Sequence, residues 1–189
     1  YFHDGSKPAS ERRVGTEHEK FVFDRRDWQT VEFDGEYGIE WILDELASRF
    51  GWEPIREEGR TIGLTRNGSG ISLEPGGQLE LSGGVHDDLV ETREELTGHL
   101  RELSELAGDR LEMAAWGLNP WVTPDEMADV PKHRYDIMER YLPTKGGMAR
   151  WMMKTSTTIQ GNYDYTSESD AVDLVRTALL LSPIVSAMF

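Results

Sequence analysis

The sequence predicts an α+β fold organised around a mainly antiparallel β-sheet. Segments with strand-like composition and segments with helical periodicity are interspersed along the 189 residues. The strongest turn signal, Asn67-Gly68 followed by Gly70, separates two strand-like segments and is typical of a β-hairpin, because these residues tolerate a positive φ. Hairpins of this kind are more evident than strand–helix–strand repeats, which favours an antiparallel sheet over a parallel one.

The first part of the chain contains three predicted strands and two predicted helices. The strands span residues 13–23, 60–66 and 71–82. Apolar residues recur at helical spacing over residues 37–50, and Gly51 supplies the stop of this helix. A second helix is predicted over residues 87–109, because Asp88 and Glu91 form a capping pattern at its start.

The remainder of the chain is predicted to alternate between short elements. They are a short apolar strand over residues 113–118, a loop with three prolines over 119–131, a helix over 132–141, a strand rich in Thr and Tyr over 154–165, and a last helix capped by Ser167 and Asp170. The apolar pattern of the last helix runs to the end of the chain, and the first residue is not Met. We therefore expect residues 1–189 to be a fragment of a longer chain.

Composition excludes several classes of function. Acidic residues number 35 and basic residues 20, and a net charge of −15 repels nucleic acid. The absence of cysteine excludes a disulfide scaffold, a thiol nucleophile and a zinc finger. No targeting segment is visible, and the apolar stretch 178–189 is shorter than a membrane span of about 20 residues. We expect a cytoplasmic protein with no nucleic-acid or membrane partner and an undetermined oligomeric state.

The first candidate site is the segment Gly15-Thr16-Glu17-His18-Glu19-Lys20. Residues two apart on a strand face the same side, so Glu17 and Glu19 present two carboxylates on one face, about 7 Å apart. Buried carboxylates repel each other, and a divalent cation with a preference for oxygen ligands, Mg²⁺ or Mn²⁺, relieves this repulsion. The alternative is an ordinary solvent-facing strand edge, which the sequence leaves open.

The second candidate site follows the predicted hairpin. Glu74, Gln78 and Glu80 have even spacing, so a regular strand points them to one face, opposite the leucines between them. Pro75 and Gly76-Gly77 indicate a bulge or bend that interrupts this register. The alternative is a half-exposed hairpin whose polar face only confers solubility.

Two weaker signals lie further along the chain. Gln160 and Asn162 share a predicted strand face, and amide groups can ligate a hard metal or hold phosphate oxygens, although a cross-strand hydrogen-bond ladder explains them equally well. Arg134 and Tyr141 are seven residues apart and share a helical face. Taken together, three strands with acceptor residues on one face predict a metal-binding trough that neutralises ATP phosphates without a phosphate-binding loop.

Four motifs occur in a fixed order: GTEHEKF at residues 15–21, GLTRNGSGISLEPGGQLELSGG at 63–84, PKHRYDIMERYLP at 131–143 and WMMKTSTTIQGNYDY at 151–165. Together they resemble the plant and proteobacterial type of glutamate–cysteine ligase. The resemblance implies part of a funnel-shaped antiparallel sheet, like that of glutamine synthetase, with helices outside. It also implies ATP-dependent joining of the glutamate γ-carboxyl to the cysteine amine through a γ-glutamyl phosphate, the first step of glutathione-type thiol synthesis.

The resemblance also assigns roles to individual residues. Metal ligands are implied at Glu17, Glu19, Glu74 and Glu80; Gln160 and Asn162 are placed near ATP and metal; Gln78, Arg134 and Tyr141 are placed beside the substrates. No side-chain nucleophile is implied, and Mg²⁺ or Mn²⁺ is the expected cofactor, with ATP as co-substrate. Plant members carry Arg at the position of Thr155, so a contact to glutamate is expected to differ here.

Two other functions stay open at this level. One is a related ligase that joins glutamate to a different amine, and the other is a metal-binding domain without turnover. Family chains are more than twice this length, so the resemblance implies that residues 1–189 are the N-terminal portion of a single carboxylate–amine ligase catalytic domain. We expect these 189 residues alone to be inactive, with the rest of the ATP pocket supplied by the remainder of the domain.

Overall fold

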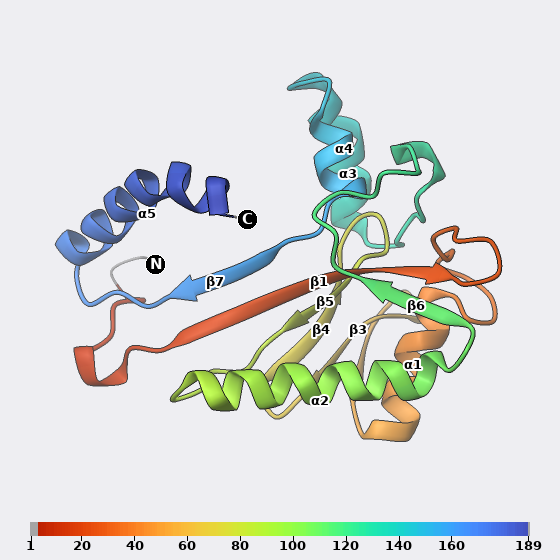
Figure 1. Cartoon of the computed structure of the whole chain (residues 1–189), viewed down its shortest axis with the longest axis horizontal. Coiled ribbons are helices and arrows are strands. Elements are labelled where there is room, and N and C mark those ends of the chain that lie inside the picture. Colours follow the sequence, from red (N-terminus) through yellow and green to blue (C-terminus); the bar gives the residue numbers. More distant parts are fainter. Residues whose placement is uncertain (1–3, 189) are drawn as a thin grey trace. The chain divides into compact units, whose positions relative to one another are not determined.

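The structure is a computed structural model that describes residues 4–188, and its helices and mainly antiparallel sheet confirm the predicted α+β class (Figure 1). The seven strands of the described residues follow the order β2-β3-β4-β5-β1-β6, and β7 also pairs with β1. The sheet is open, and the described residues do not close it into a funnel. The strands are β1 (Val14–Asp24), β2 (Glu53–Glu57), β3 (Arg60–Arg66), β4 (Ser69–Leu73), β5 (Leu79–Ser82), β6 (Leu111–Ala114) and β7 (Ile159–Tyr163).

Five α-helices accompany this sheet in the described part of the chain: α1 (Ile39–Phe50), α2 (Leu89–Ala107), α3 (His133–Tyr141), α4 (Ala149–Thr155) and α5 (Glu168–Met188). Helices α1 and α2 lie below the sheet in Figure 1, and α3 and α4 lie near the turn between β4 and β5. Three short 3₁₀ helices span Ala9–Glu11, Pro124–Glu126 and Leu142–Thr144.

The chain divides into two units, which we describe separately. The larger unit contains residues 16–160, and the smaller one combines the two ends, up to Gly15 and from Gly161.

The core of the larger unit forms because the apolar stripe of α1 meets the leucine-rich face of the sheet. The helix residues Ile39, Ile42, Leu43 and Leu46 are at most 1% exposed, and they share one cluster with sheet and α2 residues. Gly51 ends the helix with a left-handed φ of 73°, as its position in the sequence predicts. A second, smaller cluster contains Phe21 and Phe23, which by strand alternation lie on the other face of β1.

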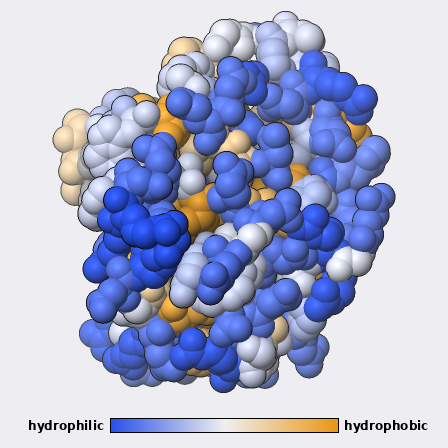
Figure 2. Space-filling view, turned by 90° about the vertical axis from the view of Figure 1, so that its right-hand side faces the viewer, coloured by the Kyte–Doolittle hydropathy of each residue, from blue (hydrophilic) through white to orange (hydrophobic). Residues whose placement is uncertain are grey.

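Helix α2 begins as its sequence predicts. The Asp88 side chain accepts hydrogen bonds from the backbone N–H groups of Val90 and Glu91. The face drawn in Figure 2 is mostly hydrophilic, with apolar side chains appearing between charged ones, in keeping with the net charge of −15.

Several predicted elements differ in the structure. The predicted strand 71–82 is two strands, β4 and β5, separated by a turn in which the Gly77 N–H donates to the Glu74 carbonyl. The predicted strand 154–165 starts too early, because residues 149–155 form α4, and the strand predicted at 113–118 lies instead at Leu111–Ala114. Strand β2 was not predicted at all; it is short, and most of its residues are exposed, so it carries little of the alternation that identifies a strand.

Helix α5 belongs to the smaller unit and is longer than the apolar stretch 178–189 that the sequence analysis compared with a membrane span. It has 21 residues, a mean hydropathy of 1.5 over its most apolar window and no buried residue in the described chain. The apolar stretch considered from the sequence covers only its second half. By length and composition this helix is long and apolar enough to cross a membrane, so the absence of a membrane partner stays a prediction.

Candidate functional site

Two glutamates lie directly opposite each other at the centre of the sheet. The antiparallel register of β1 and β5 pairs Glu19 with Glu80, and these side chains are only 7% and 8% exposed. Directly opposite residues in such a pair have Cβ atoms about 5 Å apart, and like charges at this separation are destabilising. Glu17 lies two residues along the same strand, opposite Ser82, and is partly buried. The pairing thus supports the prediction that carboxylates from two strands share one face.

Neutral donors hold both of these carboxylates. Glu19 accepts hydrogen bonds from the Thr158 N–H (2.9 Å), the Thr158 hydroxyl (2.9 Å) and the Gln160 side-chain amide (3.1 Å). Glu80 accepts from the hydroxyls of Ser72 (3.0 Å) and Ser82 (2.6 Å). Hydroxyl and amide donors orient a carboxylate without neutralising its charge, so the pair retains its attraction for a cation.

Glu74 joins the pair from the turn between β4 and β5. Burial, followed by the charges of Glu80 and Glu19, raises the pKa of Glu74 to about 7, while Arg134 and Lys132 act in the opposite direction. A carboxyl with this pKa is close to half-protonated near neutral pH. Because Glu74 responds to both other glutamates, the three groups form one electrostatic unit.

The first turn of α3 brings positive charge to this turn. The Lys132 ammonium donates to the Leu73 carbonyl (3.1 Å), the Tyr135 hydroxyl donates to the same oxygen, and Arg134 donates to the Tyr135 hydroxyl (2.8 Å). Burial, followed by the charge of Arg134, lowers the pKa of Lys132 to about 8. From the sequence, Lys132 is part of the same helix-start motif as Arg134, but nothing local assigns it a role.

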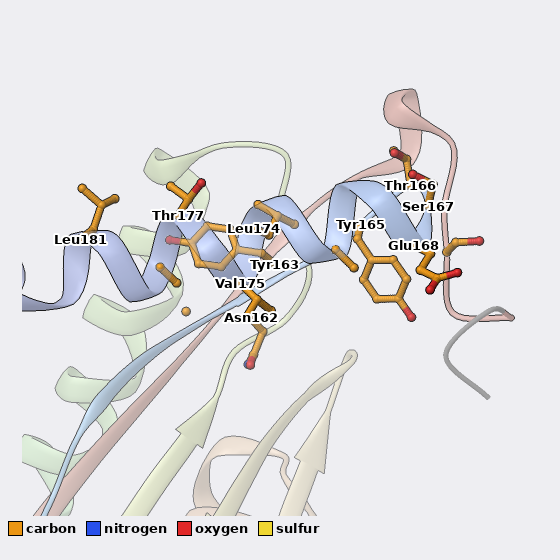
Figure 3. A pocket seen from close by; sticks show the side chains of 14 residues that line it. Asn162, Tyr163, Tyr165, Thr166, Ser167, Glu168, Leu174, Val175, Thr177 and Leu181 are labelled. Atoms are coloured by element: carbon orange, nitrogen blue, oxygen red, sulfur yellow. The ribbon is translucent and has the colours of Figure 1, made fainter.

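The remaining predicted residues lie in different surroundings. The side-chain amide of Gln78 is 1% exposed and bonds to backbone groups only. Tyr141 is 55% exposed at the end of α3, with the Lys145 ammonium 4.9 Å from its ring centre. Asn162 belongs to the smaller unit, where it lines a hollow of about 1300 Å³ between β7 and α5 (Figure 3). Their roles toward substrates or ATP stay predictions.

Thr155 occupies the position at which plant members of the resembling family carry Arg. It is fully buried at the end of α4, and its hydroxyl donates to the Trp151 carbonyl (2.7 Å). The neighbouring Lys154 is also buried and pairs with Asp129 (2.7 Å). The cations that act on Glu74 are Arg134 and Lys132 at the start of α3.

A buried basic group lies on the opposite face of the same strand. Lys20 alternates with Glu19, is 4% exposed and donates to the His18 carbonyl (2.5 Å). Burial lowers the pKa of Lys20 to about 8, against the attraction of Glu80 and Glu19. His99 of α2 is buried near it, and burial, followed by the charge of Lys20, lowers the pKa of His99 to about 3. From the sequence, Lys20 belongs to the first candidate segment without a role of its own, and His99 is interpreted as a surface or structural residue.

The carboxylate oxygens of this site are ligands of the type that a hard divalent cation prefers, but they are not arranged around one point. Carboxylate oxygens are the ligands that Mg²⁺ and Mn²⁺ prefer, and repulsion between Glu19, Glu80 and Glu74 favours a cation among them. Among residues 4–188, however, no three Asp, Glu or His side chains are close enough to form a ready-made metal cluster. Binding would require these side chains to turn from their present hydrogen-bond partners toward a shared ion.

Comparison with known proteins identifies the family. The family model described as glutamate-cysteine ligase family 2 (GCS2) matches residues 13–189. The chain belongs to this family. It is 39% identical over 192 residues to the chloroplastic glutamate–cysteine ligase A of Oryza sativa subsp. japonica, and 37% identical over 190 residues to the chloroplastic glutamate–cysteine ligases of Brassica juncea and Arabidopsis thaliana. These alignments cover all of this chain and only 36–38% of each relative, so the GCS2 chain spans less than two fifths of their length.

The comparison corrects the predicted location. These relatives are chloroplastic ligases, so the prediction of a cytoplasmic protein was wrong. The prediction rested on the first residues of the chain, and they carry no information about a longer protein.

Proposed function

We propose that the protein containing this chain is an ATP- and Mg²⁺-dependent glutamate–cysteine ligase, with Mn²⁺ as the alternative ion. It joins the γ-carboxyl of glutamate to the amine of cysteine in glutathione-type thiol synthesis. The observation that carries the proposal is the buried Glu19–Glu80 pair, with Glu74 coupled to it electrostatically. The family match and the names of the relatives support the reaction class.

The proposed reaction has two steps. An oxygen of the glutamate γ-carboxylate attacks the γ-phosphorus of ATP, ADP leaves, and a γ-glutamyl phosphate forms. The cysteine amine then attacks the acyl carbon, phosphate leaves with the acyl C–O bond pair, and the amine loses a proton to solvent. No side-chain nucleophile is involved, so the protein contributes positioning and electrostatic stabilisation.

The described residues have distinct parts in this scheme. Glu19, Glu80, Glu74 and Glu17 would hold Mg²⁺, which when bound neutralises the phosphate and carboxylate charges that meet at the reacting centre. The Thr158 and Gln160 donors fix the Glu19 carboxylate, and Ser72 and Ser82 fix that of Glu80. Arg134 and Lys132 place positive charge beside Glu74, where an anionic substrate group can be held.

The test measures phosphate release from ATP by the full-length protein with glutamate and a panel of amines. We expect release to be fastest with cysteine and to fall about 10²-fold in Glu80→Gln. Glu94→Gln, the same change at an exposed position of α2, should leave the rate unchanged. Faster release with another amine would identify a different ligase, and no release with any amine would overturn the proposal.

A further inference from the structure

Gln78 is the last residue before β5, and its amide is committed to the backbone. Its carbonyl oxygen accepts from the Gly76 N–H (2.9 Å), and its nitrogen donates to the carbonyls of Lys154 (3.1 Å) and Ser156 (2.9 Å). Both amide N–H bonds are therefore used, and the side chain is 1% exposed. A substrate that recruited this amide would take the donor away from the buried Lys154 carbonyl and the part-buried Ser156 carbonyl, and a buried carbonyl without a donor is destabilising.

The turn that carries Glu74 is seated directly against residues 154–156. A Cβ added to Gly76 would lie 2.2 Å from the Lys154 carbonyl oxygen and 3.0 Å from the Gln78 side-chain oxygen. Only a glycine permits this approach, because such a distance to a backbone oxygen is far inside van der Waals contact. The Gln78 hydrogen bonds and the glycine contact therefore fasten the same two segments together.

Each of these two segments carries or orients some of the three clustered glutamates. The turn bears Glu74 and continues into β5, which bears Glu80. Residues 154–156 continue to Thr158 and Gln160, which hold the Glu19 carboxylate. Gln78 is thus the side-chain link between the segment that supplies Glu74 and Glu80 and the segment that orients Glu19.

We infer that Gln78 is a positioning residue that sets the mutual placement of Glu19, Glu74 and Glu80, and that it does not contact substrate. The inference rests on the proposed metal-dependent ligase. It also implies that loss of Gln78 loosens this site without unfolding the unit, because residues 155 and 157 are held independently. The Thr155 carbonyl accepts from the Asn119 N–H (2.8 Å), and the Thr157 N–H donates to the Gly117 carbonyl (3.1 Å).

The first experiment follows amide hydrogen exchange in the full-length protein, wild type against Gln78→Met. We expect peptides covering residues 74–80 and 154–160 to exchange about fivefold faster or more, with α1 unchanged. Gln29→Met, the same change at an exposed position, should alter neither segment. Unchanged exchange over residues 154–160 would overturn the inference. Because exchange needs no ligase activity, it tests Gln78 even if the proposed function fails.

The second experiment separates positioning from substrate contact. As a positioning residue, Gln78→Met should lower kcat about 10²-fold and raise the Mg²⁺ concentration for half-maximal activity about tenfold, with KM for glutamate changed less than about twofold. A large rise in KM for glutamate with an unchanged Mg²⁺ requirement would instead make Gln78 a substrate ligand. If Gln78→Met does not fold, Gln78→Glu, which keeps an acceptor for the Gly76 N–H, is judged by the same two criteria.

Discussion

Replacing Glu74 by Gln is expected to stabilise the metal-free protein at alkaline pH and to leave its stability unchanged near pH 4. Burial and the neighbouring Glu80 and Glu19 raise the pKa of Glu74 from its ordinary 4.5 to about 7. The folded state therefore binds this proton more tightly than the unfolded chain does. Gln is neutral at every pH, so the variant resembles the protonated wild type.

The sign and size follow from linkage between protonation and folding. Below about pH 4.5 both states of the wild type hold the proton, and Glu74 carries no penalty. As the pH rises through 7, the folded state must also give up its proton, and the stability that the protonated carboxyl contributed is lost. Because Glu74 is partly exposed and solvent screens its charge, we expect this pKa difference to correspond to about 2 kcal/mol at pH 8 and to less than about 1 kcal/mol at pH 5.5.

The assay is urea unfolding of wild type, Glu74→Gln and Glu94→Gln at pH 4, 5.5 and 8, with a chelator present. Glu94 is exposed on α2, so its variant should stay within about 0.5 kcal/mol of wild type at each pH. Saturating Mg²⁺ should reverse the order at pH 8, because the wild type then keeps a ligand that the variant lacks. If Glu74→Gln raised the free energy of unfolding equally at pH 4 and pH 8, the reasoning would be refuted.

Three further predictions concern the metal, the seating of the turn and one helix cap. Millimolar Mg²⁺ should raise the melting temperature more than a sodium salt of equal ionic strength does, and Glu17→Gln and Glu80→Gln should lose most of this extra rise. An equal extra rise in the wild type and both variants would contradict a shared metal site. Gly76→Ala should lower the free energy of unfolding by about 1–3 kcal/mol, because its Cβ would meet the Lys154 carbonyl. Gly98→Ala, inside α2 with no atom within 4 Å of the added Cβ, should raise it by about 0.5–1 kcal/mol. A change of the same sign in both variants would count against the close approach at Gly76. Asp88→Ala should cost about 1 kcal/mol in the same measurement, because two backbone N–H groups lose their acceptor, and no loss would mean that water replaces the cap.

The sequence alone determined the elements whose signals are local. The spacing from Ile39 to Phe50 with Gly51 behind it, the Asp88 cap, and the Asn67-Gly68 turn each depend on residues a few positions apart, and the structure contains all three. The chemical type of the site was also readable, because carboxylates at even spacing on a strand and the four motifs in order both indicate an acidic centre. The family follows from the same motifs and is confirmed by the match over residues 13–189.

The tertiary structure decided which of these side chains meet. The pairing of Glu19 with Glu80 depends on the register of two strands about 60 residues apart in the chain, and no local signal sets that register. The same holds for Lys132 on the Leu73 carbonyl and for Gln78 on Lys154 and Ser156, since each pair is brought together only when distant segments pack. Lys154 and Thr155 end helix α4, although the sequence predicts the start of a strand there, because packing against distant segments decides the conformation of so short a stretch. Local physics thus determined the parts of this site, and long-range packing determined their placement.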